Sequence, residues 1–364
     1  MTDHNFTALC LAIEANVPVL WWGAPGIGKS ARLAGYARAT RRHCETVIAS
    51  ILEPSDFAGL PVRDGDRARY LPPEWAVRLV DHDGGILFFD EISTAAPACQ
   101  AALLRVVFER VAGQLRLPAA THIVAAANPA EQAAGGWDLS HPLANRFLHL
   151  ESSPDVGAWT NGLLSGFPDP EPVRLPAEWR AYLPASRAKV AAFVKVRPHL
   201  LLTVPTDAGK ASRGWPSPRS WDMLSTAQAA AESIRAPDDV ILPLVVGAIG
   251  EGAGLEYATF ARELDLPDPE ELLRHPGKFV LPERGDMAFA VLASVAAAAI
   301  ANLTEARWCA AWEILERTCK AGSKDLAARA GMLLGEQRAK VPNYPVPTAV
   351  LRELQPLIEA VRGK

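Results

Sequence analysis

The residues with the clearest chemistry lie in the stretch Gly23-Ala24-Pro25-Gly26-Ile27-Gly28-Lys29-Ser30-Ala31, whose first eight positions satisfy the pattern GxxxxGK[ST]. Glycines in such a loop allow backbone N–H groups to converge on phosphate oxygens at the start of a helix. Lys29 would reach the β- and γ-phosphates of a nucleotide, and the Ser30 hydroxyl would ligate Mg²⁺. The whole stretch is predicted to contact the nucleotide. The alternative is a glycine- and proline-rich turn between a strand and a helix.

Two adjacent carboxylates, Asp90 and Glu91, end an apolar run in GGILFFDEIS, residues 84–93. A carboxylate at the end of a buried strand is costly unless something pairs with it. Mg²⁺ would supply that pairing for Asp90, and Glu91 is positioned to polarise an attacking water as a general base. The alternative is that both acids cap the following segment. The glycine-rich loop upstream favours the catalytic interpretation.

Three further polar residues follow along the chain. Asn128 ends the apolar run THIVAAANP, Arg146 lies in HPLANRFLHL, and Arg219 lies in WPSPRSWDML. Asn128 could donate a hydrogen bond to the nucleotide or to its water. Taken alone, Asn128 before a proline indicates a turn, and Arg146 indicates a solvated or salt-bridged side chain. Arg219 taken alone indicates only the start of a helix. The order of Asn128 after the first two motifs strengthens its catalytic interpretation.

The elements that must position these residues alternate between short β-type runs and helical patterns. This alternation predicts an α/β fold around a mainly parallel sheet. The predicted strands are 18–22, 46–49, 86–89 and 122–126, and the helical stretches include 30–41 and 97–111. Trp21 and Trp22 end the central strand, one ring on each face, and are predicted to pack rather than to stack on a base.

After Arg146 the composition changes to proline-rich segments and then to alanine-rich helical patterns. The segment 287–304 carries no charge, but it falls short of the ~20 strongly apolar residues that a bilayer needs, so it predicts a buried helix and no membrane span. The predicted helices of this half are 221–234, 239–249, 255–263, 286–303 and 306–321.

The composition of the 364 residues sets the broad class of protein. With 49% apolar and 21% charged residues, the chain is predicted to be globular with two or three domains. A net charge of −4 gives no general attraction to nucleic acid. The five scattered cysteines form no CxxC pair and the histidines do not cluster, which favours reduced thiols over disulfides or zinc. No export signal is visible, so the predicted location is cytoplasmic.

Taken in order, the five motifs resemble those of an AAA+ ATPase, over about residues 5–260. GAPGIGKS resembles Walker A, FFDEI resembles Walker B, and AAANP resembles the sensor-1 strand with Asn128. ANRF resembles the arginine-finger segment with Arg146, and SPRSW resembles the sensor-2 helix with Arg219.

Within that superfamily the chain resembles the MoxR-like branch. Residues 53–75, EPSDFAGLPVRDGDRARYLPPEW, resemble the β-hairpin insert of that branch, with a turn at 64–66. Residues 111–124 resemble its hairpin before sensor 1. One departure is that Ser93-Thr94 replaces the usual Asn-Arg after Walker B, so a role for an arginine there is not expected.

The resemblance implies a P-loop AAA+ core with a parallel sheet and β-hairpin inserts, then an α-helical lid and a further helical region. The corresponding domains are 1–152, 153–276 and 277–364. It also implies a ring, commonly a hexamer, that binds ATP or ADP with Mg²⁺ between subunits. Arg146 would act in trans on the neighbour's γ-phosphate, and Arg219 would contact the phosphate in cis and couple hydrolysis to lid rotation.

MoxR-like ATPases commonly work with a von Willebrand factor A domain protein and remodel or activate client proteins. The segment 277–364 is expected at a subunit or partner interface. Two other functions stay open. A nucleotide-gated scaffold would hydrolyse slowly, which the presence of Glu91, Asn128 and both arginines argues against. A DNA-acting AAA+ motor would use a local basic patch on the insert hairpin, formed by Arg63, Arg67 and Arg69.

Overall fold

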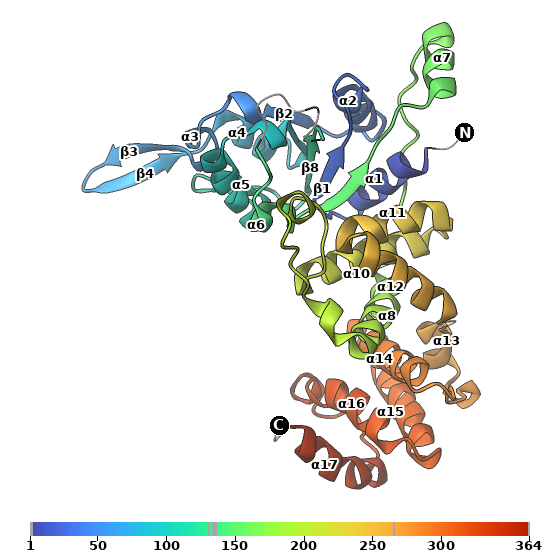
Figure 1. Ribbon diagram of the computed structural model, residues 1–364. Coiled ribbons are helices and arrows are strands. Elements are labelled where there is room, and N and C mark those ends of the chain that lie inside the picture. The colour runs from blue at the N-terminus through green and yellow to red at the C-terminus, as the bar shows by residue number, and fades with distance from the viewer. Residues whose placement is uncertain (1–2, 130–131, 133–136, 265, 363–364) are drawn as a thin grey trace. The chain divides into compact units, whose positions relative to one another are not determined.

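The computed structural model describes residues 3–129, 132, 137–264 and 266–362 (Figure 1). The chain forms two compact units, and each is described by itself. The sheet unit comprises residues 1–176 and 200–256, and the helical unit comprises residues 177–199 and 257–364. The three-domain division at residues 152 and 276 remains a prediction.

A five-stranded sheet with the strand order β2-β5-β8-β1-β9 organises the sheet unit. All four pairings are parallel, which confirms the predicted α/β class. The strands are β1 (Val19–Trp22), β2 (Cys44–Ile48), β5 (Gly85–Asp90), β8 (Thr121–Ala127) and β9 (Leu148–Glu151). The first four match the predicted runs, whereas β9 is not among the predicted strands.

Helices cover both faces of the sheet. Trp22 lies in one apolar core with Trp75 of α4 and Leu103 of α5, while Trp21 packs against Phe6 of α1, with ring centroids 5.7 Å apart. The two tryptophans therefore occupy opposite faces as packing residues, as predicted. The helices near the sheet are α1 (His4–Glu14), α2 (Lys29–Ala39), α3 (Ser55–Ala58), α4 (Glu74–Asp81), α5 (Pro97–Glu109) and α6 (His141–Ala144).

Two antiparallel hairpins interrupt this α/β pattern at the predicted places. The first, β3 (Leu60–Asp64) with β4 (Arg67–Leu71), projects from the sheet unit (Figure 1). Gly65 in its turn has φ 62°, a left-handed conformation that glycine tolerates well. The second hairpin is short and joins β6 (Val111–Ala112) to β7 (Leu115–Arg116).

The sheet unit continues with helices that follow β9 in the sequence. Helix α11 packs against α1, α10 and β9. Helix α12 crosses the boundary between the two units. These helices are α7 (Val156–Ser165), α9 (Ala208–Ala211), α10 (Pro218–Ser233), α11 (Asp238–Ile249) and α12 (Glu251–Glu263).

The helical unit packs around α14, whose inward residues are almost fully buried against α8 and α16. The uncharged segment at 287–304 is thus a buried helix, as predicted. Among the described residues, none of the helices has the length and apolar character needed to cross a membrane. The unit contains α8 (Leu183–Val196), α13 (Pro269–Arg274), α14 (Gly285–Ala301), α15 (Glu305–Lys320), α16 (Lys324–Gly335) and α17 (Thr348–Arg362).

Candidate functional site

The polar residues that follow four strands of the sheet meet at one edge. Because the strands are parallel, their carboxyl ends lie together. The glycine-rich loop follows β1, Asp90 ends β5, Asn128 follows β8, and Ser50 follows β2. Ligand sites of open parallel sheets characteristically lie outside the carboxyl ends of the strands.

The glycine-rich loop runs directly into α2, whose first residue is Lys29. Gly26 and Gly28 have φ values of 79° and 88°, in the left-handed region that favours glycine. Gly28 provides no side-chain cap, and the first turn of α2 carries no acidic residue. The N–H groups and the positive end of the helix dipole therefore face the loop, an arrangement suited to phosphate.

The Lys29 ammonium is held inside this loop. Its Nζ donates hydrogen bonds to the carbonyls of Gly23 at 2.6 Å and Ala24 at 3.1 Å, and to Oδ1 of Asn128 at 3.0 Å. Burial lowers the pKa of Lys29, while the charges of Asp90 and Glu91 act in the opposite direction. All three of these hydrogen-bond acceptors are neutral, so the positive charge remains available to attract an anion.

Ser30 and Asp90 form the second contact of the site. The Ser30 hydroxyl donates to Oδ2 of Asp90 at 2.7 Å, and the other carboxylate oxygen accepts from the backbone N–H of Glu91 at 3.0 Å. A hydroxyl and a carboxylate are oxygen ligands of the kind that Mg²⁺ binds together with nucleotide phosphates. The described residues contain no group of three or more His, Cys, Asp or Glu side chains that could hold a metal. Phosphate oxygens and waters would therefore have to complete the coordination of Mg²⁺ here.

Glu91 is held in a defined position by its neighbours. Its backbone is left-handed at φ 56°, which is costly for a residue with a Cβ. The Ser50 hydroxyl donates to Oε2 of Glu91 at 2.7 Å, and the Thr94 hydroxyl donates to the Glu91 carbonyl at 2.8 Å. Sequence reasoning missed Ser50, because nothing in the local pattern links the end of β2 to Glu91.

Ser93 and Thr94 have a structural explanation. The backbone N–H of Asn128 donates to the Ser93 hydroxyl at 3.3 Å, and Thr94 supports the Glu91 carbonyl. The Ser-Thr pair that replaces Asn-Arg therefore contacts two of the predicted catalytic residues through short hydroxyl groups.

Arg146 lies at the opposite edge of the sheet from the loop. It precedes β9 by two positions, and Leu148 is in register with Val19, the first residue of β1. From that level Gly23 is four residues further along β1, or roughly 13 Å at 3.3 Å per residue. This separation exceeds the length of an arginine side chain, so Arg146 cannot reach the loop of its own chain.

Arg219 lies beside Arg146 rather than beside the loop. The guanidinium carbons of Arg146 and Arg219 lie 5.0 and 5.3 Å from the ring centroid of Phe108, an exposed residue near the end of α5. Burial and the nearby charge of Arg219 lower the pKa of Arg146. Across the described residues, neither arginine forms an ion pair with a carboxylate.

Asn145 explains why the two arginines are neighbours. Its Nδ2 donates to the Trp215 carbonyl at 3.2 Å, and its Oδ1 accepts from the Ser217 hydroxyl at 2.7 Å. Ser217 is the N-cap of α10, which carries Arg219. Sequence reasoning missed Phe108, Asn145 and Ser217. Only Asn145 carried a signal, because it adjoins Arg146 in the ANRF motif.

Comparison with known proteins decides the family of the sheet unit. Residues 18–147 match the family model of the AAA domain, dynein-related subfamily. Residues 18–147 therefore form an AAA domain. The match begins just before β1 and ends directly after Arg146, so it includes the loop, both carboxylates and Asn128.

Two solved structures are similar to this AAA+ chain. One is a candidate ATPase from Cytophaga hutchinsonii, with 15% identity, a TM-score of 0.44, and coverage of 71% of this chain and 88% of the other. The second is a full-length MCM homologue from Methanopyrus kandleri, with 19% identity, a TM-score of 0.37, and coverage of 66% and 56%. Among curated proteins, none matches the sequence.

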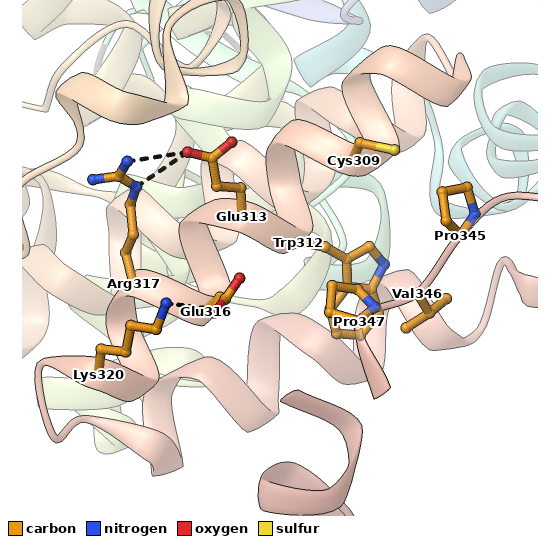
Figure 2. A pocket seen from close by; sticks show the side chains of 9 residues that line it. All are labelled: Cys309, Trp312, Glu313, Glu316, Arg317, Lys320, Pro345, Val346 and Pro347. Atoms are coloured by element: carbon orange, nitrogen blue, oxygen red, sulfur yellow. Dashed lines mark hydrogen bonds and ion pairs between the residues drawn. The ribbon is translucent and has the colours of Figure 1, made fainter. Parts of the chain in front are cut away.

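A groove in the helical unit is a separate surface outside the AAA+ domain (Figure 2). It has a volume of about 700 Å³ and lies between α15 and residues 345–347. Two ion pairs on α15 line it, Glu313 with Arg317 at 3.1 Å and Glu316 with Lys320 at 2.6 Å. Trp312 also lines it, and its buried Nε1 has no hydrogen-bond partner among the described residues.

Proposed function

We propose that this protein is a MoxR-like AAA+ ATPase that hydrolyses Mg²⁺-bound ATP in a ring, commonly a hexamer, and remodels or activates a client protein. The observation that carries the proposal is the separation of two half-sites. The glycine-rich loop, Asp90, Glu91 and Asn128 lie at one edge of the sheet, and Arg146 and Arg219 lie at the other. A second copy is needed to bring the two halves together.

The loop half binds the nucleotide. Backbone N–H groups between Gly23 and Ala31, Pro25 excepted, donate hydrogen bonds to the phosphate oxygens, and Lys29 neutralises the β- and γ-phosphates once it exchanges its carbonyl contacts for phosphate oxygens. Ser30 and Asp90 would hold Mg²⁺, and the ion would offset the negative charge that develops on the phosphates.

The water reacts between Glu91 and Asn128. Glu91 accepts a proton from the water, whose oxygen bonds to the γ-phosphorus while the bond to the β–γ bridging oxygen breaks; ADP and inorganic phosphate leave. Asn128 already bonds Lys29 through Oδ1, so its amide is positioned to orient the water or the γ-phosphate. The Ser50 contact must loosen for Glu91 to act as the base.

Arg146 and Arg219 serve the neighbour's nucleotide as a pair. Their shared position on Phe108 supports a common role in trans, in place of the cis contact that the resemblance implies for Arg219. Two guanidinium groups without carboxylate partners can stabilise the charge that develops on the γ-phosphate.

The proposal also includes the protein partners and the cellular location. We propose a von Willebrand factor A domain protein as companion, a protein client and a cytoplasmic location, with the α15 groove as the surface for the companion or client. A DNA-acting motor is less well supported. Among the arginines of the insert hairpin, Arg63, Arg67 and Arg69, the first two are separated by Asp64 and Asp66, whose charges weaken any basic patch.

Steady-state ATPase activity of the wild type and of Glu91→Gln tests this proposal. The variant should bind ATP with unchanged affinity and lose at least a hundredfold in kcat, because only the base is removed. Undiminished turnover by Glu91→Gln contradicts the proposed ATP-driven motor. A wild type without ATPase activity also contradicts it and favours the nucleotide-gated scaffold. Strong stimulation of turnover by DNA at physiological salt supports the DNA-acting alternative instead.

A further inference from the structure

Helix α7 exposes an apolar surface that none of the described residues of the sheet unit covers. Only Gly162 is buried, by the ring of Phe167. The helix stands away from the sheet at the end of its connecting segment (Figure 1). Its large apolar side chains are mostly exposed: Val156 77%, Trp159 55%, Leu163 63%, Leu164 85% and Phe167 66%.

A helix of this length requires packing to persist. Isolated helices shorter than about 12 residues are marginal in water, and α7 has 10 residues. Val156, Trp159 and Leu163 follow the spacing i, i+3, i+7 and so form a stripe on one face. The segment 156–168 carries no charged residue. Such a surface is characteristic of an interface.

The α7 segment is anchored to the sheet unit at both ends, and its entering side lies close to the glycine-rich loop. There the backbone N–H of Ser152 donates to the Trp22 carbonyl at 2.8 Å, directly before Gly23. On the leaving side, Asp169 pairs at 2.6 Å with Arg38, near the end of α2 that lies away from the loop. Helix α7 therefore departs from the edge of the sheet where the nucleotide binds.

A second exposed apolar patch lies beside Arg219. Leu201, Leu202 and Val204 are 42%, 58% and 49% exposed. The backbone N–H of Thr203 donates to the Pro216 carbonyl at 3.0 Å, two positions before the start of α10. The segment 200–206 also lacks charge, so its burial against α7 would desolvate no ionised side chain.

We propose that α7 of one chain docks on the Leu201–Leu202–Val204 patch of the neighbouring copy. The patch lies next to Arg219, and α7 departs next to the loop that Arg219 of the neighbour must reach. The contact therefore forms at the same boundary that completes the ATP site. It joins two different surfaces of identical chains, a head-to-tail contact of the kind that forms a ring when the rotation between copies closes. The inference rests on the proposed ring.

Native mass measured with ATP in the Glu91→Gln background tests this docking. The double variant Trp159→Ser/Leu163→Ser should need at least a tenfold higher concentration to assemble, and Leu202→Ser should show the same defect. ATP affinity of the single chain and the thermal midpoint should not change, because these side chains are exposed. Val280→Ser is the matched control, since Val280 is 82% exposed in the helical unit and should not affect assembly.

A disulfide experiment tests whether α7 of a second copy is what covers the Leu201–Leu202–Val204 patch. With the exposed Cys309 replaced by serine, Leu164→Cys combined with Leu202→Cys should give a ladder of covalent oligomers on mild oxidation. Either cysteine alone should give none of the higher oligomers. No ladder, or full assembly of the α7 variants, overturns the docking. The proposed function then stands if the wild type still assembles and hydrolyses ATP, whereas a wild type that stays monomeric with ATP overturns both.

Discussion

The Ser217 hydroxyl donates a 2.7 Å hydrogen bond to Oδ1 of Asn145, and this contact ties the start of α10 to the segment that carries Arg146. Both residues are buried, at 4% and 5% exposure. Two parts of the sequence more than 70 residues apart thereby place Arg146 and Arg219 on one exposed ring. We infer that the two arginines reach the neighbouring nucleotide as one rigid unit.

Replacing Asn145 should uncouple the arginine pair. Asn145→Ala removes two buried hydrogen bonds, while Ser220 still bonds both the Trp215 carbonyl and the Ser217 hydroxyl, so the loss costs about 1 kcal/mol of stability per bond. We expect a lower thermal midpoint together with at least a tenfold loss of kcat, while the ATP dissociation constant of the single chain stays unchanged. A lower thermal midpoint with an unchanged kcat would show that the contact does not position the arginines. Ser225→Ala, a change inside the same helix α10, is the control for a general defect of that helix.

Phe108 should position both guanidinium groups through its ring. Phe108→Leu keeps the apolar volume but removes the ring face, and cation–π contacts at exposed sites contribute about 0.5–1 kcal/mol each. We expect kcat to fall roughly threefold to tenfold, with KM little changed, and Phe108→Tyr to restore it. If the leucine and tyrosine variants have equal kcat values, the aromatic face has no role in positioning.

Ser50 should restrain Glu91, the proposed general base. Its hydrogen bond to a carboxylate is worth about 1.5 kcal/mol, equivalent to roughly a tenfold change in an equilibrium constant. Ser50→Ala should therefore raise basal kcat at saturating ATP by up to about tenfold, because Glu91 no longer has to break that contact. Ser50→Thr, which retains a hydroxyl, should behave like the wild type. A fall in kcat for the alanine variant would show instead that Ser50 holds Glu91 in its working position.

His149 should make stability fall at acidic pH. It is buried below the loop, accepts a hydrogen bond from the Trp22 indole at 2.9 Å and bonds the Ala144 carbonyl through Nε2 at 2.9 Å. Burial lowers the pKa of His149 to about 4. The unfolded chain, with the usual pKa near 6.5, binds more protons between these values, so stability is lost as pH falls from about 6.5 to about 4.

The loss attributable to His149 should approach about 3 kcal/mol at the acid end of this range, as an order of magnitude. Denaturant unfolding of wild type and His149→Gln across this pH range measures it as the difference between the two profiles. His275→Gln, an exposed histidine, serves as the control. Parallel profiles for wild type and His149→Gln would contradict the assignment.

The sequence predicts the loop half of the site well, because each of its residues directly follows a strand of a parallel sheet. Lys29, Asp90 and Asn128 are close in space for that reason alone. The buried α14 follows from its uncharged, alanine-rich pattern, whereas both hairpins were expected from the family resemblance. The short strand β9 was missed: Leu148, His149, Leu150 and Glu151 do alternate between apolar and polar, but four residues are too few for that pattern to stand out.

The arginine half of the site was less accessible to sequence reasoning. Arg146 and Arg219 could be named from their motifs, but their common position depends on Phe108 and Asn145, contacts between distant segments that no local pattern encodes. Ser50 is a similar case, since its contact to Glu91 exists only after β2 and β5 have paired.

The central claim is that one copy supplies Glu91 and the next supplies Arg146. ATPase activity of Glu91→Gln, of Arg146→Ala and of their equimolar mixture tests it most directly. Each variant alone should be nearly inactive. The mixture should recover a substantial fraction of wild-type turnover, because an intact Glu91 from one variant then meets an intact Arg146 from the other. A mixture as inactive as its components, under conditions where native mass shows that they co-assemble, would contradict the shared site.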